Sequence, residues 1–123
     1  MSHDIGSLRG LMAGVEDARV TLVRKRRSLQ QAINDALAAE FGPADRDPEF
    51  RAWVLPGMWV NVDFDQSAAT RGMWSADAHI GIDVSVDAQA DTPRSAVTQA
   101  LAALALTHPN EAAALAAVIP EAP

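Results

Sequence analysis

The sequence predicts an α+β fold: an amphipathic N-terminal helix, a small antiparallel sheet of two or three strands, and C-terminal helices packed on that sheet. Three observations predict it. Hydrophobic residues recur at helical spacing before Gly42, alternate with polar residues over 58–87, and return to helical spacing after Thr92. The chain has 123 residues, of which 25 are alanine. That length fits one domain with a thin core, which a partner subunit would help to bury.

The N-terminal segment carries a hydrophobic residue at every seventh position, a spacing typical of a long amphipathic helix. These residues are Leu8, Val15, Leu22, Leu29 and Ala36. Ser28 and Gln31 have the form of a capping box, which marks the start of a helix. We therefore expect either one bent helix or, preferably, two consecutive helices with a break near Arg27–Ser28. The segment should end at Gly42-Pro43, since glycine suits the position after a helix and proline cannot continue it.

Two segments alternate between hydrophobic and polar residues and are predicted to be strands. They are Met58–Asp65 and His79–Asp87. We expect them to pair antiparallel across the connection Gln66–Ala78, which is long for a hairpin. Phe50–Leu55 is short and apolar and precedes the turn residues Pro56-Gly57, so it is a candidate third strand.

The C-terminal part predicts two helices. Thr92-Pro93 supplies a capping hydroxyl followed by proline at the first helical position, and Asn110–Ile119 predicts a second, short helix. Leu101, Leu104 and Leu115 supply hydrophobic faces that we expect to cover the sheet and to complete their burial against a neighbouring copy. The whole chain then forms one domain, with a helical extension over 1–27, a core over 28–106 and a C-terminal helix and tail over 107–123.

The net charge of −6 is unevenly distributed. Residues 1–60 carry eight basic and eight acidic side chains, whereas residues 61–123 carry two basic and eight acidic ones. Arg24, Lys25, Arg26 and Arg27 form a basic patch that would suit nucleic acid or an acidic partner. The alternative is a solvated helix surface, which the acidic balance of the whole chain favours. A chain with this asymmetry can also associate with copies of itself.

The residue types exclude several kinds of chemistry. The chain has no cysteine, which excludes disulfides, thiolate catalysis and cysteine-bound metals. The sequence contains no nucleophile elbow, glycine-rich phosphate loop or paired histidine motif, so we expect a protein that is not an enzyme and has no cofactor. The strand pattern points several acidic residues to one face. They form a solvated surface, which is the preferred interpretation, a site for a hard cation, or an acid and a base for glycoside hydrolysis. These residues are Asp63, Asp65, Asp83 and Asp87, with His79 beside them.

Two Met-Trp pairs, Met58-Trp59 and Met73-Trp74, lie near the predicted hairpin. They form either an adaptable contact surface or core anchors in a chain that is poor in large side chains.

No apolar run approaches 18 residues, and Met1–Gly14 lacks the layout of a signal peptide. We therefore expect no membrane association and a cytoplasmic location.

The stretch His79–Leu106 runs as an alternating strand, an acidic turn, a Thr-Pro cap and an Ala/Leu helix. Together with Leu29–Gly42 and Ala52–Asp65, it resembles the tail-terminator, or tail-completion, proteins of long-tailed bacteriophages over about residues 29–106. The resemblance implies a small α/β subunit that closes the tail tube as a ring, usually of six, and presents the surface to which neck proteins attach. It also implies a place in the virion after assembly in the host cytoplasm.

Two other functional classes fit parts of the sequence. The small nucleoid-associated proteins of the YbaB type also run from a long helix to a three-stranded sheet and a helix, and they pair as dimers. In that case Arg24–Arg27 would contact DNA phosphates without reading bases. The third class is a small acidic inhibitor or adaptor that binds an enzyme through its acidic strand face.

Overall fold

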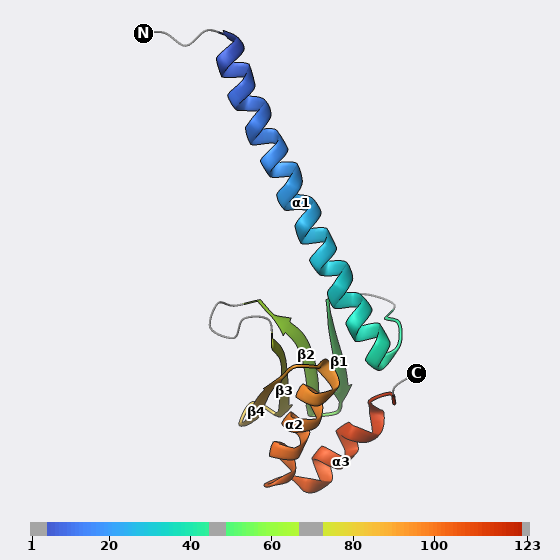
Figure 1. Cartoon of the computed structure of the whole chain (residues 1–123). Coiled ribbons are helices and arrows are strands. Elements are labelled where there is room, and N and C mark those ends of the chain that lie inside the picture. Colours follow the sequence, from blue (N-terminus) through green and yellow to red (C-terminus); the bar gives the residue numbers. More distant parts are fainter. Residues whose placement is uncertain (1–4, 45–48, 67–72, 122–123) are drawn as a thin grey trace. The chain divides into compact units, whose positions relative to one another are not determined.

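The computed structural model describes residues 5–44, 49–66 and 73–121 (Figure 1). Its elements are α1 (Ile5–Phe41), β1 (Phe50–Leu55), β2 (Met58–Asp65), β3 (Met73–Ile80), β4 (Val84–Ala90), α2 (Pro93–Ala105) and α3 (Pro109–Val118). The fold is α+β, as predicted, and the sheet has four strands rather than two or three. The chain divides into two compact units, Met1–Ala32 and Ile33–Pro123, called here the N-terminal unit and the C-terminal unit.

The helix α1 is continuous, so the preferred break near Arg27–Ser28 is wrong. A capping serine needs a non-helical backbone, and adopting one here would open hydrogen bonds that the continuous helix keeps. No glycine or proline lies between Val15 and Phe41 to favour such a break. The predicted end of the helix is confirmed at Gly42, which has φ +85° and donates its N–H to the carbonyl of Ala38 at 2.8 Å.

The sheet is an antiparallel meander in the order β1-β2-β3-β4. The predicted strand Met58–Asp65 is confirmed as β2, and Phe50–Leu55 is β1. The prediction of one strand over His79–Asp87 is wrong, because the chain turns there: β3 ends at Ile80, Gly81 has φ +57° and β4 begins at Val84. The predicted connection Gln66–Ala78 correspondingly contains most of β3.

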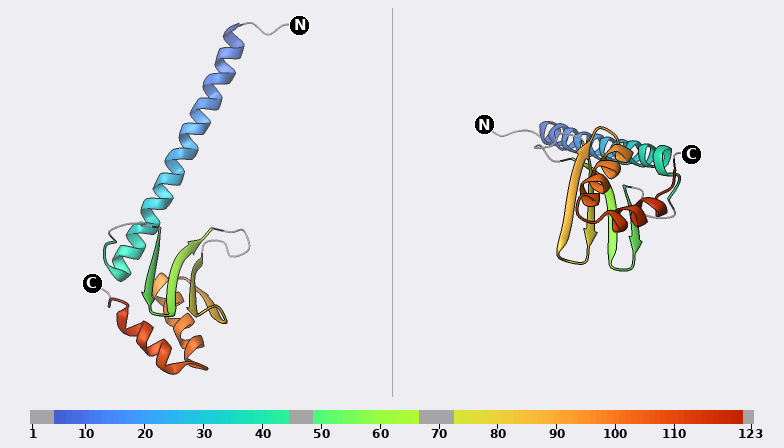
Figure 2. Two further views of the ribbon diagram at one scale, coloured as in Figure 1. Left: turned by 180° about the vertical axis from the view of Figure 1, so that it is seen from behind. Right: turned by 90° about the horizontal axis from the view of Figure 1, so that it is seen from below.

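The helices α2 (Pro93–Ala105) and α3 (Pro109–Val118) cover one face of the sheet (Figure 2). The start of α2 is confirmed, with Thr92 Oγ1 accepting the N–H of Ser95 at 3.2 Å and proline following. The second helix is confirmed as α3. On the covered face the strands contribute Val60, Val62, Ala76 and Ala78, which are 0–1% exposed. Because many of the side chains in this core are alanines, the helices approach the sheet closely and bury little area per residue.

Candidate interaction surfaces

The face of the sheet opposite the helices, called here the open face, carries a group of acidic residues. Strand alternation and register put Asp77 directly across from Asp87 on one side and from Asn61 on the other. Asp63 lies two residues along β2 from Asn61, on the same face and diagonal to Asp77. Asp65 follows on the same face of β2. The prediction of a shared face is therefore confirmed for Asp63, Asp65, Asp87 and His79, although Asp65 and Asp87 lie two strands apart.

Asp83 does not belong to this face, because it lies in the turn between β3 and β4. The sequence pattern does not predict Asp77 as a member of this group, because Asp77 lies in the segment expected to be the connection Gln66–Ala78. Across the described ranges of the chain, no group of three or more His, Asp or Glu side chains is placed to hold a metal ion.

Neighbouring carboxylates on the open face disfavour the ionisation of Asp63. The pKa of Asp63 is raised above its ordinary value, first by partial burial of the carboxyl and then by repulsion from Asp77 and Asp65. A backbone hydrogen bond partly opposes this rise. A cationic partner over this face would oppose the repulsion at Asp63, because a nearby positive charge favours the charged form of this carboxyl.

The open face also has a hydrophobic edge. Successive outward positions of β1 are Phe50, Ala52 and Val54, and the exposed fractions of Phe50 and Val54 are 42% and 73%. Trp59 lies directly opposite Val54 on the neighbouring strand β2. The Trp59 ring stacks on the ring of His79 on β3, with ring centroids 4.7 Å apart and ring planes 17° from parallel. The face therefore combines hydrophobic and acidic side chains, a mixture found in protein interfaces.

The two Met-Trp pairs are each divided between the faces of the sheet, since neighbouring strand residues point in opposite directions. Trp59 and Met73 lie on the open face. Met58 packs against the core, and Trp74 is 7% exposed with its ring edge-on to Phe64 at 5.1 Å. Trp74 is thus a core anchor, which is one of the two roles considered for it.

The expected contact residues of the C-terminal helices need a correction. Leu101, Leu104 and Leu115 are 8%, 0% and 0% exposed within this chain alone. The sheet and the other helices already cover them, so they are core residues and present almost no surface to a neighbouring copy. Any contact with another protein has to use other side chains.

A hollow of about 230 Å³ lies beside the first residue of β1. Its polar lining includes Glu49, Asn61, Asp63 and Gln66. The hollow is smaller than the roughly 300–1,000 Å³ of typical small-molecule sites. It therefore adds acidic and polar groups to the edge of the open face rather than forming an enclosed binding pocket.

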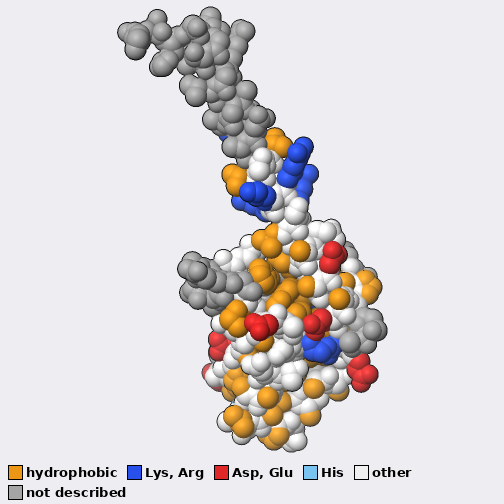
Figure 3. Space-filling view, in the orientation of Figure 1, with side chains coloured by type: hydrophobic (Ala, Val, Ile, Leu, Met, Phe, Trp, Pro, Cys, Tyr) orange, Lys and Arg blue, Asp and Glu red, His pale blue; other side chains and the backbone are white. Residues whose placement is uncertain are grey.

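The predicted basic patch lies on α1 within the N-terminal unit. Arg24, Lys25, Arg26 and Arg27 are all exposed, and Figure 3 shows blue side chains gathered on this part of the helix. Successive helix residues are rotated by about 100°, so the four cations surround the helix rather than occupy one side. A shallow hollow on one side is lined by Arg19, Val20, Val23, Arg24 and Arg27. Val20 and Val23 are each 45% exposed, so this side of the helix is both basic and hydrophobic.

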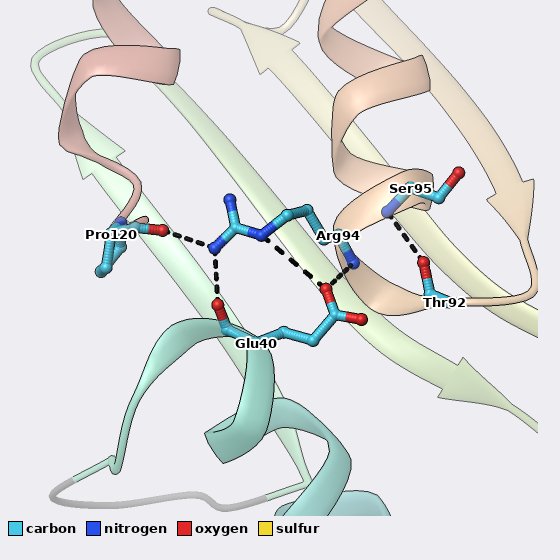
Figure 4. A network of polar contacts seen from close by, with 5 residues as sticks. All are labelled: Glu40, Thr92, Arg94, Ser95 and Pro120. Carbon is cyan, nitrogen blue, oxygen red and sulfur yellow. Dashed lines mark hydrogen bonds and ion pairs between the residues drawn. The ribbon is translucent and has the colours of Figure 1, made fainter. Parts of the chain in front are cut away.

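A polar network that no sequence pattern predicts joins three parts of the C-terminal unit (Figure 4). The carboxylate of Glu40, near the end of α1, accepts the backbone N–H of Arg94 at 3.1 Å in the first turn of α2. The Arg94 guanidinium donates to the carbonyls of Glu40 and Pro120 at 2.5 and 2.6 Å and lies 4.8 Å from the centre of the Phe41 ring. The only signal in the sequence is that Arg94 is one of two basic residues after residue 60.

No helix in the described part of the chain is both long enough and apolar enough to cross a membrane.

Comparison of the chain with protein-family models, with curated proteins and with solved structures found no match in any of the three. Proposals about function therefore depend on the two surfaces themselves.

Proposed function

We propose that this protein is a non-enzymatic assembly subunit that works through protein–protein contacts. The observation that carries the proposal is the open face of the sheet, where exposed Phe50 lies across from Asp63 and exposed Val54 shares the face with Asp77 and Asp87. Monomeric proteins bury most large hydrophobic side chains, and a mixed hydrophobic and charged surface on a rigid sheet suits a protein partner.

Within that class we propose a subunit of the tail-terminator type, which forms an oligomeric ring and contacts neighbouring tail or neck proteins. The order of helix, antiparallel sheet and covering helices supports this proposal. The small core supports it as well, since a chain rich in alanine gains stability when other copies cover its exposed hydrophobic side chains.

DNA binding in the manner of the YbaB-type proteins is the second candidate. Its supporting observation is the exposure of all four cations from Arg24 to Arg27. The acidic open face opposes it, because DNA near that face is repelled unless the face points away.

Light scattering on the 123-residue chain tests the proposal. The native mass is measured at about 50 mM and about 500 mM salt, with and without a short DNA duplex, a range over which phosphate contacts weaken steeply. The assembly proposal expects a mass of several subunits that DNA does not change. A dimer that binds DNA at low salt would favour the second candidate. A monomer under every condition, at concentrations up to about 100 μM, would contradict self-assembly.

A further inference from the structure

Two exposed surfaces of this chain have opposite charge and similar hydrophobic content. One is the basic segment, defined as Val20, Val23, Arg24 and Arg27 on one side of α1. The other is the open face, with Asp63 and Asp77 as its central acids and Phe50 and Val54 along its β1 edge. The first lies in the N-terminal unit and the second in the C-terminal unit.

We infer that the basic segment of one copy docks on the open face of the sheet of a second copy. This inference rests on the proposed assembly function and names the partner and the surfaces that function uses. Such a contact is heterologous, because two different surfaces meet and each copy keeps one of each free. Repetition of the contact produces a ring if the rotation closes and an open chain if it does not.

The dimensions of the two surfaces agree. Phe50 and Val54 are four strand residues apart, or about 13 Å, and Val20 and Arg27 are seven helix residues apart, or about 10 Å. A helix is about 10 Å wide, and neighbouring strands are about 4.8 Å apart. A helix lying along the β1 edge therefore covers about two strands, which places its valines over the hydrophobic edge and its arginines within reach of the acids on β2 and β3.

Charge complementarity identifies a second copy as the occupant. Residues 61–123 carry a net charge of −6, whereas the segment 18–34 contains five basic side chains and no acidic one. Both halves of the contact are present in every copy and at equal concentration. The mutual repulsion at Asp63 is a further reason why a cationic partner suits this face.

Charge reversal in pairs tests this contact. The helix variant carries Arg24→Glu and Arg27→Glu, and the sheet variant carries Asp63→Lys and Asp77→Lys. Each variant alone then has two surfaces of the same sign, so we expect self-association to weaken by roughly tenfold or more. In an equimolar mixture each variant offers the surface that the other lacks, so assembly should return. Sedimentation velocity at low salt measures all three samples.

Two control variants make equal charge changes elsewhere. Lys25→Glu with Arg26→Glu changes other sides of the same helix, and Asp83→Lys with Asp91→Lys changes exposed positions in the turn and after β4. Both should assemble nearly as the unchanged protein does. Circular dichroism checks that every variant is folded, which we expect because the substituted side chains are exposed except for Asp77, which is half-buried.

The outcomes separate this inference from the proposed function. If the unchanged protein assembles and the mixture of variants stays dissociated, the inference is wrong and the assembly function stands. Undiminished assembly of either variant alone also overturns the inference. If the unchanged protein is monomeric under all conditions, the proposed function fails first. Loss of DNA binding in the helix variant, with no self-association in any sample, would assign the basic segment to nucleic acid instead.

Discussion

Two stretches of α1 have a similar hydrophobic pattern and very different surroundings. In the C-terminal unit, Ile33 and Leu37 are 3% and 0% exposed, whereas in the N-terminal unit Leu22 and Leu29 are 65% and 38% exposed. The spacing of hydrophobic residues determines which side chains share a helix face. Whether that face is buried depends on elements elsewhere in the chain, or on another chain.

The described residues of the N-terminal unit all belong to α1. An isolated helix in water has little stability of its own, because most helix stability in proteins comes from packing of a hydrophobic face. The C-terminal unit has its own core, whereas the N-terminal unit has exposed valine and leucine side chains among cations. This contrast is the reason for the proposal that another chain covers the N-terminal stretch of α1.

The largest expected effect comes from matched substitutions in the two stretches. Leu37→Ala should lower the free energy of unfolding by about 2–5 kcal/mol, because it opens a cavity in the core. Leu22→Ala makes the same chemical change at an exposed position and should alter it by less than about 0.5 kcal/mol in the dissociated protein. Urea unfolding at low protein concentration measures both. Equal losses would show that the two stretches do not differ as described.

A smaller effect is expected from the polar network in the C-terminal unit. Arg94→Ala removes the donor to the carbonyls of Glu40 and Pro120 and should destabilise the fold by about 1–3 kcal/mol. Arg26→Ala removes an exposed arginine from the N-terminal unit and serves as the control, with a change under about 0.5 kcal/mol. Urea unfolding compares the two. If Arg94→Ala resembles the control, the network adds no stability and the two arginines are equivalent.

The parts of the fold that the sequence predicts correctly are those with local signals. Gly42 ends α1, Thr92 caps α2, and the alternation over Met58–Asp65 forms β2, each through chemistry within a few residues. The turn between β3 and β4 was missed because Ile82 continues the alternation of its neighbours, although it is 98% exposed in the turn. The strand β3 was missed because Ala76 and Ala78 give only a weak hydrophobic signal.

The surfaces were harder to predict than the elements. The sequence identifies Leu104 and Leu115 as hydrophobic, but only the packing shows that this chain buries them completely. Glu40 and Arg94 are 54 residues apart, so no local pattern connects them. The acidic group was predicted in part, since Asp63, Asp65 and Asp87 follow from strand alternation and Asp77 depends on the register of a strand that was not expected.

The smallest expected effect concerns the acids of the open face in the dissociated protein. The raised pKa of Asp63 means that the folded protein holds this proton more tightly than the unfolded chain. Ionising Asp63 therefore costs the folded protein stability. This cost is absent at pH values below the ordinary pKa of 3.8, grows as the pH rises toward the raised pKa of the folded state, and is complete above that raised pKa. Asp63 is exposed and water screens its charge, so Asp63→Asn should stabilise the protein at pH 7 by no more than about 0.5 kcal/mol, and this gain should vanish near pH 3.

The control for this substitution is Asp83→Asn, which makes the same change in net charge at an exposed turn residue outside the open face. Thermal unfolding at pH 7 and at pH 3 compares the two variants with the unchanged protein. A larger gain for Asp63→Asn at pH 7 would show that the repulsion is local to the open face. Equal gains for both variants would mean that the effect comes from net charge alone, and the open face would then lose its electrostatic distinction from the rest of the C-terminal unit.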